Sequence, residues 1–171
     1  MGRRPSGAEI RTVLPSSIEE LERIRAACRS MVKKRAAVSG VASMVPIPGA
    51  DVLADVGMLM ELIPAINERF GLAPEQIGRL DPKTKFLVYR LVTEVGGPLV
   101  GKVIKKQLIV AVLKKVGIRM GAKQAAKFVP LAGQAVAALL GAGAMLYIGN
   151  SHIDDCFRVA HGALNPESTD A

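Results

Sequence analysis

Near the carboxyl end of the chain, three side chains have the chemistry to bind a metal or attack a substrate. In the sequence His152-Ile153-Asp154-Asp155-Cys156, the residues His152, Asp155 and Cys156 stand at positions i, i+3 and i+4 and share one face of a helix. Such a trio could hold a transition metal, and a Cys–His pair could supply a nucleophile. A fourth ligand is not evident, and side chains on one helical turn rarely align for attack. We therefore interpret the trio as the polar face of a helix, and we assign no catalytic residue, metal site or cofactor to it.

A second motif resembles a phosphate-binding loop. Gly96-Gly97-Pro98-Leu99-Val100-Gly101-Lys102 fits the pattern G-x-x-x-x-G-K, in which backbone amides cradle phosphate. The next residue is Val103, where a Mg²⁺-binding loop requires Ser or Thr, and Pro98 lacks an amide. A Gly/Pro connection between two helices is therefore the better interpretation, and no small-molecule substrate is identified.

The elements that would position these residues are predicted to be helices. Helical spacing of apolar residues, interrupted by Gly and Pro, predicts an all-α bundle of about six to eight helices. Flanking this domain (residues 16–164), residues 1–15 are expected to form a flexible basic arm and residues 165–171 a flexible tail. The predicted helices are Ser17 to about Arg35, Val52 to about Phe70, Pro82 to about Val95, Leu99 to Val116, Ile118 to Phe128, Leu131 to Asn150, and a polar helix through Cys156 to about Ala163.

Several helix boundaries carry local signals. Ser17-Ile18-Glu19-Glu20 is a capping box, Asp51 and Asp81 are good N-cap residues, and Gly71 ends a helix. Prolines and a glycine mark the breaks between helices. These structural turns are placed at Pro46, Pro48, Gly49, Asp51 and Pro130.

The positive charge of the chain is concentrated in one third of its length. The net charge is +8, yet no acidic residue occurs between Val95 and Ile153. Such a segment favours a polyanion, and the absence of interleaved aromatic residues argues against nucleic acid. A solvated face is the plainer alternative to headgroup contact on an anionic membrane. The residues predicted to contact lipid or a partner are Lys105, Lys106, Lys114, Lys115, Arg119, Lys123 and Lys127.

An uncharged segment follows these cations. Phe128 to Ile153 is a run of 26 residues without charge, long enough as a helix to span a bilayer. Its composition is weak for that purpose, because it is rich in Gly and Ala. Gly133, Ala137 and Gly141 form a stripe that allows close helix packing, and such a helix could equally lie in a soluble core.

A second apolar segment, Ala36 to Met60, contains two carboxylates. Asp51 and Asp55 make a clean membrane span costly, so we interpret this segment as a re-entrant hairpin or a buried helix pair. A solvated position is favoured for Asp55 over a role in proton or ion relay.

An internal repeat accompanies a family resemblance. Val45-Pro46-Ile47-Pro48-Gly49 is echoed by Val129-Pro130-Leu131-Ala132-Gly133, which predicts two pseudo-repeated helix–break–helix units unless the match is due to chance. These motifs, with Asn67-Glu68-Arg69-Phe70-Gly71, resemble the bacterial YcjF-like helical domain of unknown function, which also occurs C-terminal to Era-type GTPase domains and has the EcsC family as a distant cousin. The resemblance implies a helical, membrane-associated bacterial protein that works beside a GTPase.

Three functions remain open on these observations. The leading one is a non-enzymatic protein at the cytoplasmic face of the inner membrane, bound through the basic segment and the helix Gly133 to Ile153. The second is a soluble cytoplasmic adaptor that self-associates or partners a GTPase. The third, a nucleotide- or metal-dependent enzyme, would use Lys102 or the His152/Cys156 cluster.

Overall fold

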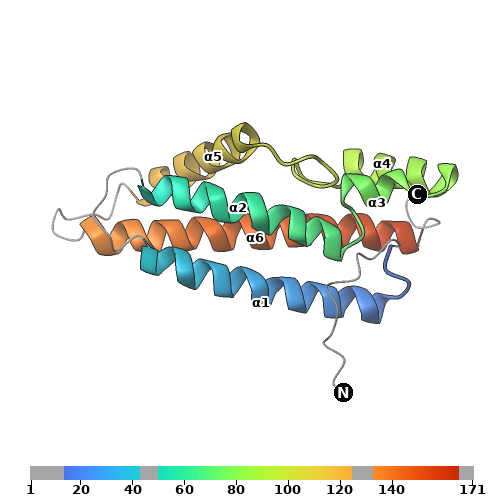
Figure 1. Cartoon of the computed structure of the whole chain (residues 1–171), viewed down its shortest axis with the longest axis horizontal. Coiled ribbons are helices and arrows are strands. Elements are labelled where there is room, and N and C mark those ends of the chain that lie inside the picture. Colours follow the sequence, from blue (N-terminus) through green and yellow to red (C-terminus); the bar gives the residue numbers. More distant parts are fainter. Residues whose placement is uncertain (1–13, 43–49, 125–132, 166–171) are drawn as a thin grey trace, which may run out of the picture.

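The computed structural model describes residues 14–42, 50–124 and 133–165, and the side chains of residues 14–38, 55–116 and 142–165 within them. The described chain is entirely helical (Figure 1), as predicted, and contains no strand. The helices are α1 (Ile18–Ala42), α2 (Ala50–Arg69), α3 (Pro74–Gly78), α4 (Pro82–Glu94), α5 (Lys106–Gln124) and α6 (Gly133–Leu164).

The number of longer helices is lower than the expected six to eight. Among the described residues, five helices are longer than two turns, whereas α3 has only five residues. The predicted break at Gly117 is absent, because α5 continues through it to Gln124. The predicted helices Leu131 to Asn150 and Cys156 to Ala163 are one 32-residue helix, α6, since no proline separates them.

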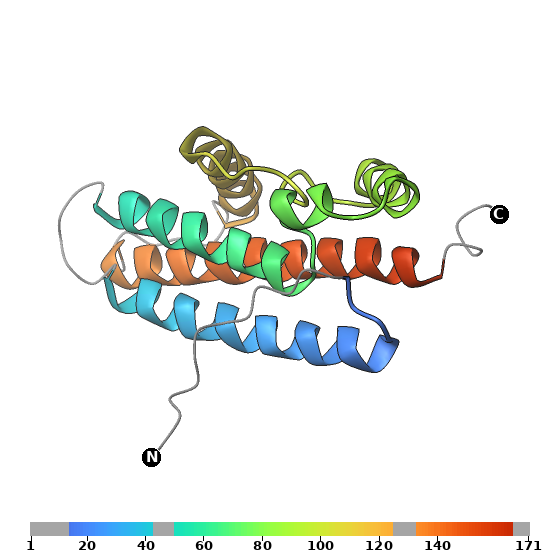
Figure 2. The ribbon, with the colours of Figure 1, turned by 45° about the vertical axis from the view of Figure 1, so that its right-hand side comes forward.

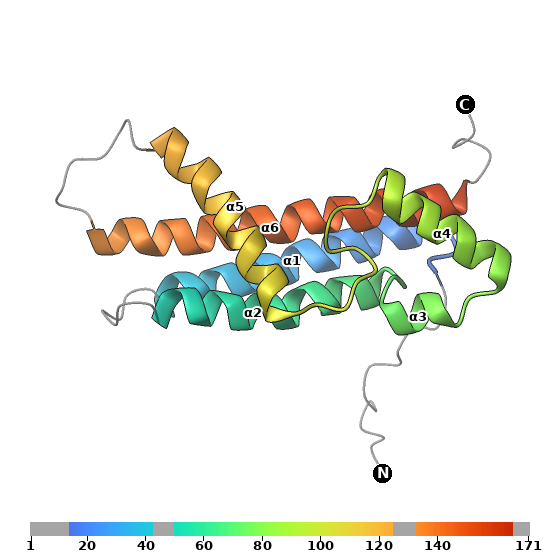
Figure 3. The same ribbon diagram turned by 90° about the horizontal axis from the view of Figure 1, so that it is seen from above.

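Three long helices form the central layer of the bundle. α1, α2 and α6 lie side by side, and α1 runs antiparallel to the other two (Figure 1). The most extensive contact is between α1 and α6. α3, α4 and α5 lie together on one side of this layer, where α5 crosses α2 and α6 and α4 packs on α6 (Figures 2 and 3).

The core follows the helical spacing of apolar residues. From α1 it receives Leu21, Ile24, Cys28 and Val32, and α6 contributes Met145, Ile148 and Ile153. Ion pairs also join α1 and α6: the guanidinium groups of Arg25 and Arg29 lie 2.8 and 3.1 Å from the Asp154 carboxylate. The guanidinium of Arg25 also lies 4.6 Å from the ring centre of Phe157.

Most of the local boundary signals are confirmed. The Ser17 hydroxyl accepts from the Glu20 amide at 3.2 Å, and the Asp81 carboxylate accepts from the amides of Lys83 and Thr84. Gly71 has a φ of 73° and ends α2 in a Schellman motif, with the Leu72 amide donating to the Asn67 carbonyl at 2.8 Å.

The prediction for Asp51 is wrong in its detail. α2 begins at Ala50, so Asp51 is the second residue of the helix and does not precede it as an N-cap. Pro46, Pro48, Gly49 and Pro130 lie outside the described residues, as do the arm 1–13 and the tail 166–171. The helix ends that flank both breaks lie at the same end of the bundle (Figure 1).

The two apolar segments were expected to contact or enter a membrane. None of the helices, over the residues described, combines the length and the apolarity that a bilayer span requires. The part of the uncharged segment from Ala142 onward packs in the bundle, where Met145 and Ile148 are buried. Asp55 is also buried, so the expectation that it is solvated is wrong: α2 turns this face toward its neighbours.

Candidate functional site

A buried polar cluster joins the three helices of the central layer. It consists of Cys28 from α1, Asn67 from α2, and His152 and Cys156 from α6, all of them buried. The Cys156 thiol donates to the Asn67 side-chain oxygen at 3.4 Å, and its sulfur lies 3.6 Å from Nε2 of His152. The Asn67 amide group donates in turn to the Leu99 carbonyl at 3.2 Å. The cluster therefore connects the helices with the segment that follows α4.

Burial keeps the titratable members of the cluster uncharged at neutral pH. His152 is 2% exposed, and desolvation lowers its pKa from 6.5 to about 4, although a backbone interaction with Ile63 opposes that shift. Burial raises the pKa of Cys28 to about 11 and that of Cys156 well above 9.0. A thiol of high pKa beside a neutral imidazole is a poor nucleophile, because the thiolate is the reactive form.

The structure separates the trio predicted from the sequence. His152 and Cys156 belong to the cluster, but the Asp155 carboxylate accepts a hydrogen bond from Arg158, whose Nε donates to the Val95 carbonyl at 3.2 Å. Burial raises the pKa of Asp155, against the nearby Arg158 charge, which lowers it. The three residues were interpreted as the polar face of a helix, and the structure adds that His152 and Cys156 on this face are buried. Within the described residues, no three His, Cys, Asp or Glu side chains are placed to hold a metal ion.

The glycine-rich segment Gly96–Lys102 connects two helices. It follows the helix α4 where a phosphate-binding loop follows a strand, and α5 begins only at Lys106. Gly97 lies against Asp155, where a Cβ atom would overlap the carboxylate, and Gly101 has a φ of 66°. The glycines therefore serve the close approach to α6 and the turn.

The predicted contact lysines whose side chains are described are all solvent-exposed. Lys105 and Lys106 stand at the start of α5, and Lys114 and Lys115 two turns later. Within the described part of the chain, no carboxylate lies within ion-pairing distance of any of the four. The buried residues Ile109 and Val116 hold one side of α5 against the bundle, and the exposed lysines are distributed around the rest of its circumference. We call Lys105, Lys106, Lys114 and Lys115 the α5 lysine face.

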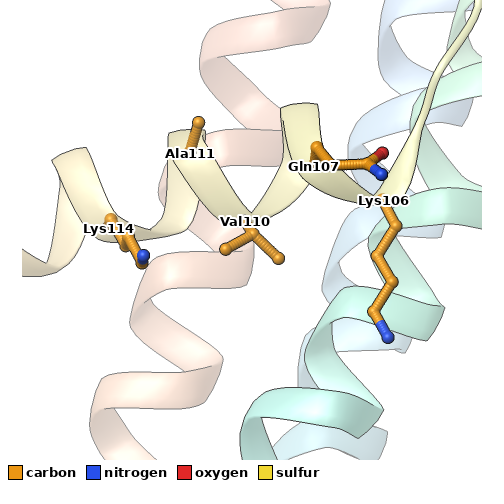
Figure 4. A pocket seen from close by; sticks show the side chains of 5 residues that line it. All are labelled: Lys106, Gln107, Val110, Ala111 and Lys114. Carbon is orange, nitrogen blue, oxygen red and sulfur yellow. The ribbon is translucent and has the colours of Figure 1, made fainter.

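An open groove of about 320 Å³ runs along this helix (Figure 4). Lys106 and Lys114 lie at its two ends and point to the same side of α5, with Val110 between them. The lining described is completed by Gln107 and Ala111. The groove thus presents a short apolar floor between two cations.

The other predicted contact residues are described only in part. Arg119 and Lys123 are in α5, and Gly133, Ala137 and Gly141 are in α6, but the surroundings of these side chains lie outside the description, as does Lys127 entirely. A close helix approach of the predicted kind does occur further along α6. A Cβ atom on Gly149 would lie 2.7 Å from the side chain of Val32 on α1.

Sequence reasoning missed an exposed apolar stripe on α4. Phe86 and Tyr89 are 72% and 52% exposed, while Val88 and Leu91 on the opposite face are buried. The spacing of Val88 and Leu91 is helical and matches that of Phe86 and Tyr89. The sequence alone therefore left open which of the two faces would pack inward.

Comparisons with known proteins identify no relative of the chain. No protein-family model, no curated protein and no solved structure matches it.

Proposed function

We propose that this chain is a non-enzymatic helical protein that binds an anionic membrane surface through the α5 lysine face. The proposal is supported by one observation above all: four exposed lysines, which have no carboxylate partner among the residues that the structure describes, lie in α5 or directly before it, and another side of this helix is fixed in the core. The charge of a paired lysine is already balanced by a group within the protein. The charges of these four lysines are accessible to an external anion.

The spacing of the cations suits a surface better than a compact ligand. Lys106 and Lys114 are eight residues apart, which is about 12 Å along a helix. Lipid headgroups form a continuous array of negative charge, and each lysine near such a surface contributes about 1 kcal/mol to binding. Arg119 and Lys123 extend the same helix, and we include them in the proposal on the sequence pattern alone.

The proposal assigns less lipid contact to α6 than the sequence analysis expects for the helix Gly133 to Ile153. From Ala142 onward α6 is occupied with α1 and α2, so lipid contact is assigned to α5. We propose the cytoplasmic face of the inner membrane as the location, in keeping with the resemblance to the YcjF-like domain. A GTPase partner, self-association and the two pseudo-repeated units likewise stay predictions.

Vesicle co-sedimentation tests the proposal. Lys114→Gln/Lys115→Gln removes two neighbouring charges from α5, and Lys33→Gln/Lys34→Gln removes an equally exposed neighbouring pair from α1. We expect the wild type to bind phosphatidylglycerol-containing vesicles at low salt, and the α5 variant to bind about thirty-fold more weakly, from about 1 kcal/mol per charge.

The matched pair on α1 provides the control. The α1 variant should bind within about two-fold of wild type, because α1 lies across the bundle from α5 (Figure 2) and screened charges act over about 8–10 Å. Equal binding to neutral phosphatidylcholine vesicles, or equal losses in the two variants, would contradict the proposal. A protein that ignores both kinds of vesicle would favour the adaptor.

A further inference from the structure

The outward face of α4 carries two large aromatic side chains that the fold does not use. Phe86 and Tyr89 are held outward because Val88 and Leu91 anchor the opposite face in the core. Pro82 and Thr93 extend the same exposed stripe at helical spacing. Phe70, in contrast, is fully buried. A side chain as large as Phe left in water is an informative exception in a folded protein.

This aromatic stripe lies on the same side of the molecule as the α5 lysine face. α4 and α5 both lie over the same side of the layer formed by α1, α2 and α6 (Figures 2 and 3). The segment between them exposes a further apolar residue, Val103, together with Lys102. A planar surface that meets one helix can therefore approach the other.

The charges around the stripe are mainly positive. Between Asp81 at its N-cap and Glu94 at its last position, α4 carries Lys83, Lys85 and Arg90. Glu94 is offset by Arg90, whose Nε lies 3.8 Å from its carboxylate. Exposed aromatic rings framed by cations complement the boundary of an anionic bilayer, where Phe and Tyr reach the acyl chains and cations remain among the phosphates.

We propose that Phe86 and Tyr89 form an interfacial anchor that enters the headgroup region of the anionic membrane contacted by the α5 lysine face. This inference rests on the proposed function and assigns to the same surface a second, apolar contact. A second copy of the chain is a poorer occupant, because pairing two such faces would bring lysine against lysine. The two contacts have different roles: the lysines attract the protein to the anionic surface, and insertion of the two rings slows its dissociation.

A single tryptophan can report on the anchor, because the chain has no Trp of its own. Phe86→Trp places the reporter in the stripe, and Val38→Trp places it at a position of similar exposure, 60%, on α1. With phosphatidylglycerol vesicles we expect the emission of the Phe86→Trp variant to shift to shorter wavelength and to be quenched by brominated acyl chains. The Val38→Trp variant should show neither change. Phe86→Ser/Tyr89→Ser should weaken vesicle binding roughly ten-fold.

The outcomes separate this inference from the proposed function. Binding that is lost in Lys114→Gln/Lys115→Gln, with an unshifted and unquenched Phe86→Trp, would overturn the anchor and leave the lysine face standing. A wild-type protein that binds no vesicle would overturn both. A shift in the Phe86→Trp variant that grows with protein concentration in the absence of vesicles would show self-association through α4, and would also overturn the anchor.

Discussion

The central layer and the α4–α5 side of the molecule treat polar side chains in opposite ways. In the centre, Asn67, His152 and Cys156 are buried and contact one another across two helices. On the α4–α5 side, Lys105, Lys106, Lys114 and Lys115 are exposed, without an ion pair among the described residues. His152 and Cys156, whose residue types are common in catalytic sites, thus make internal contacts. The side chains accessible to a partner are lysines and two aromatic rings. Residue type alone is therefore a poor guide to the working surface here.

If the buried polar cluster stabilises the fold, low pH should destabilise the protein through His152, and this is the largest effect that we expect. The pKa of His152 is about 4 in the folded chain and 6.5 as its reference value, so the unfolded chain binds the extra proton. With respect to His152, the free energy of unfolding therefore has its full value above pH 6.5. It decreases as the pH falls toward 4, by an amount on the order of 3 kcal/mol. Urea unfolding at pH 7, 5 and 4 measures this loss.

Two variants assign that acid dependence to its residue. His152→Gln should be less stable than wild type at pH 7 and lose less of its remaining stability toward pH 4. His161→Gln, the same substitution at the other histidine of α6, is the matched control. An unchanged acid profile in the His152→Gln variant would mean that other groups cause it.

Removal of Asn67 should have the next largest effect on the central layer. Asn67→Ala leaves the buried Leu99 carbonyl and the Cys156 thiol without this partner, and we expect the free energy of unfolding to fall by about 2 kcal/mol. Gln107→Ala makes the same kind of change on the exposed face of α5 and should alter it by less than about 0.5 kcal/mol. Equal effects would remove the contrast between the two regions.

A pair of glycine substitutions gives the smallest effects and opposite signs. Gly149→Ala introduces a methyl group 2.7 Å from the Val32 side chain, whereas a Cβ atom on Gly57 in α2 would meet nothing within 4 Å. We expect the first to destabilise the protein by about 1 kcal/mol and the second to stabilise it by about 0.5–1 kcal/mol through helix propensity. Thermal unfolding of both variants would sharpen the description of the α1–α6 contact. Stabilisation by both would show that the helices have room to separate.

The features that could be predicted from the sequence are those fixed by near neighbours. The capping residues Ser17 and Asp81, and Gly71 after α2, act within four residues of the helix ends they define. All three were placed correctly for that reason. The all-helical class follows in the same way, from apolar spacing repeated along one segment at a time.

The features that could not be predicted depend on contacts between distant segments. The start of α5 was expected at Leu99, but the Leu99 carbonyl is held by Asn67, 32 positions earlier. Burial of Asp55, His152 and Cys156 likewise depends on which helices surround them. For the candidate lysines the sequence indicated the positions. It did not indicate that the four with described side chains have no ion pair among the described residues. The stripe Phe86–Tyr89 required knowledge of which face of α4 packs on α6.

The close pairing of α1 with α6 also constrains how the chain is made. α1 makes its most extensive contact with α6, which begins more than a hundred residues after the start of α1. On the ribosome this contact therefore has to wait until α6 has been translated. During that interval the part of α1 that packs on α6 is uncovered, and this is the period when nascent chains are most prone to aggregate or to recruit chaperones.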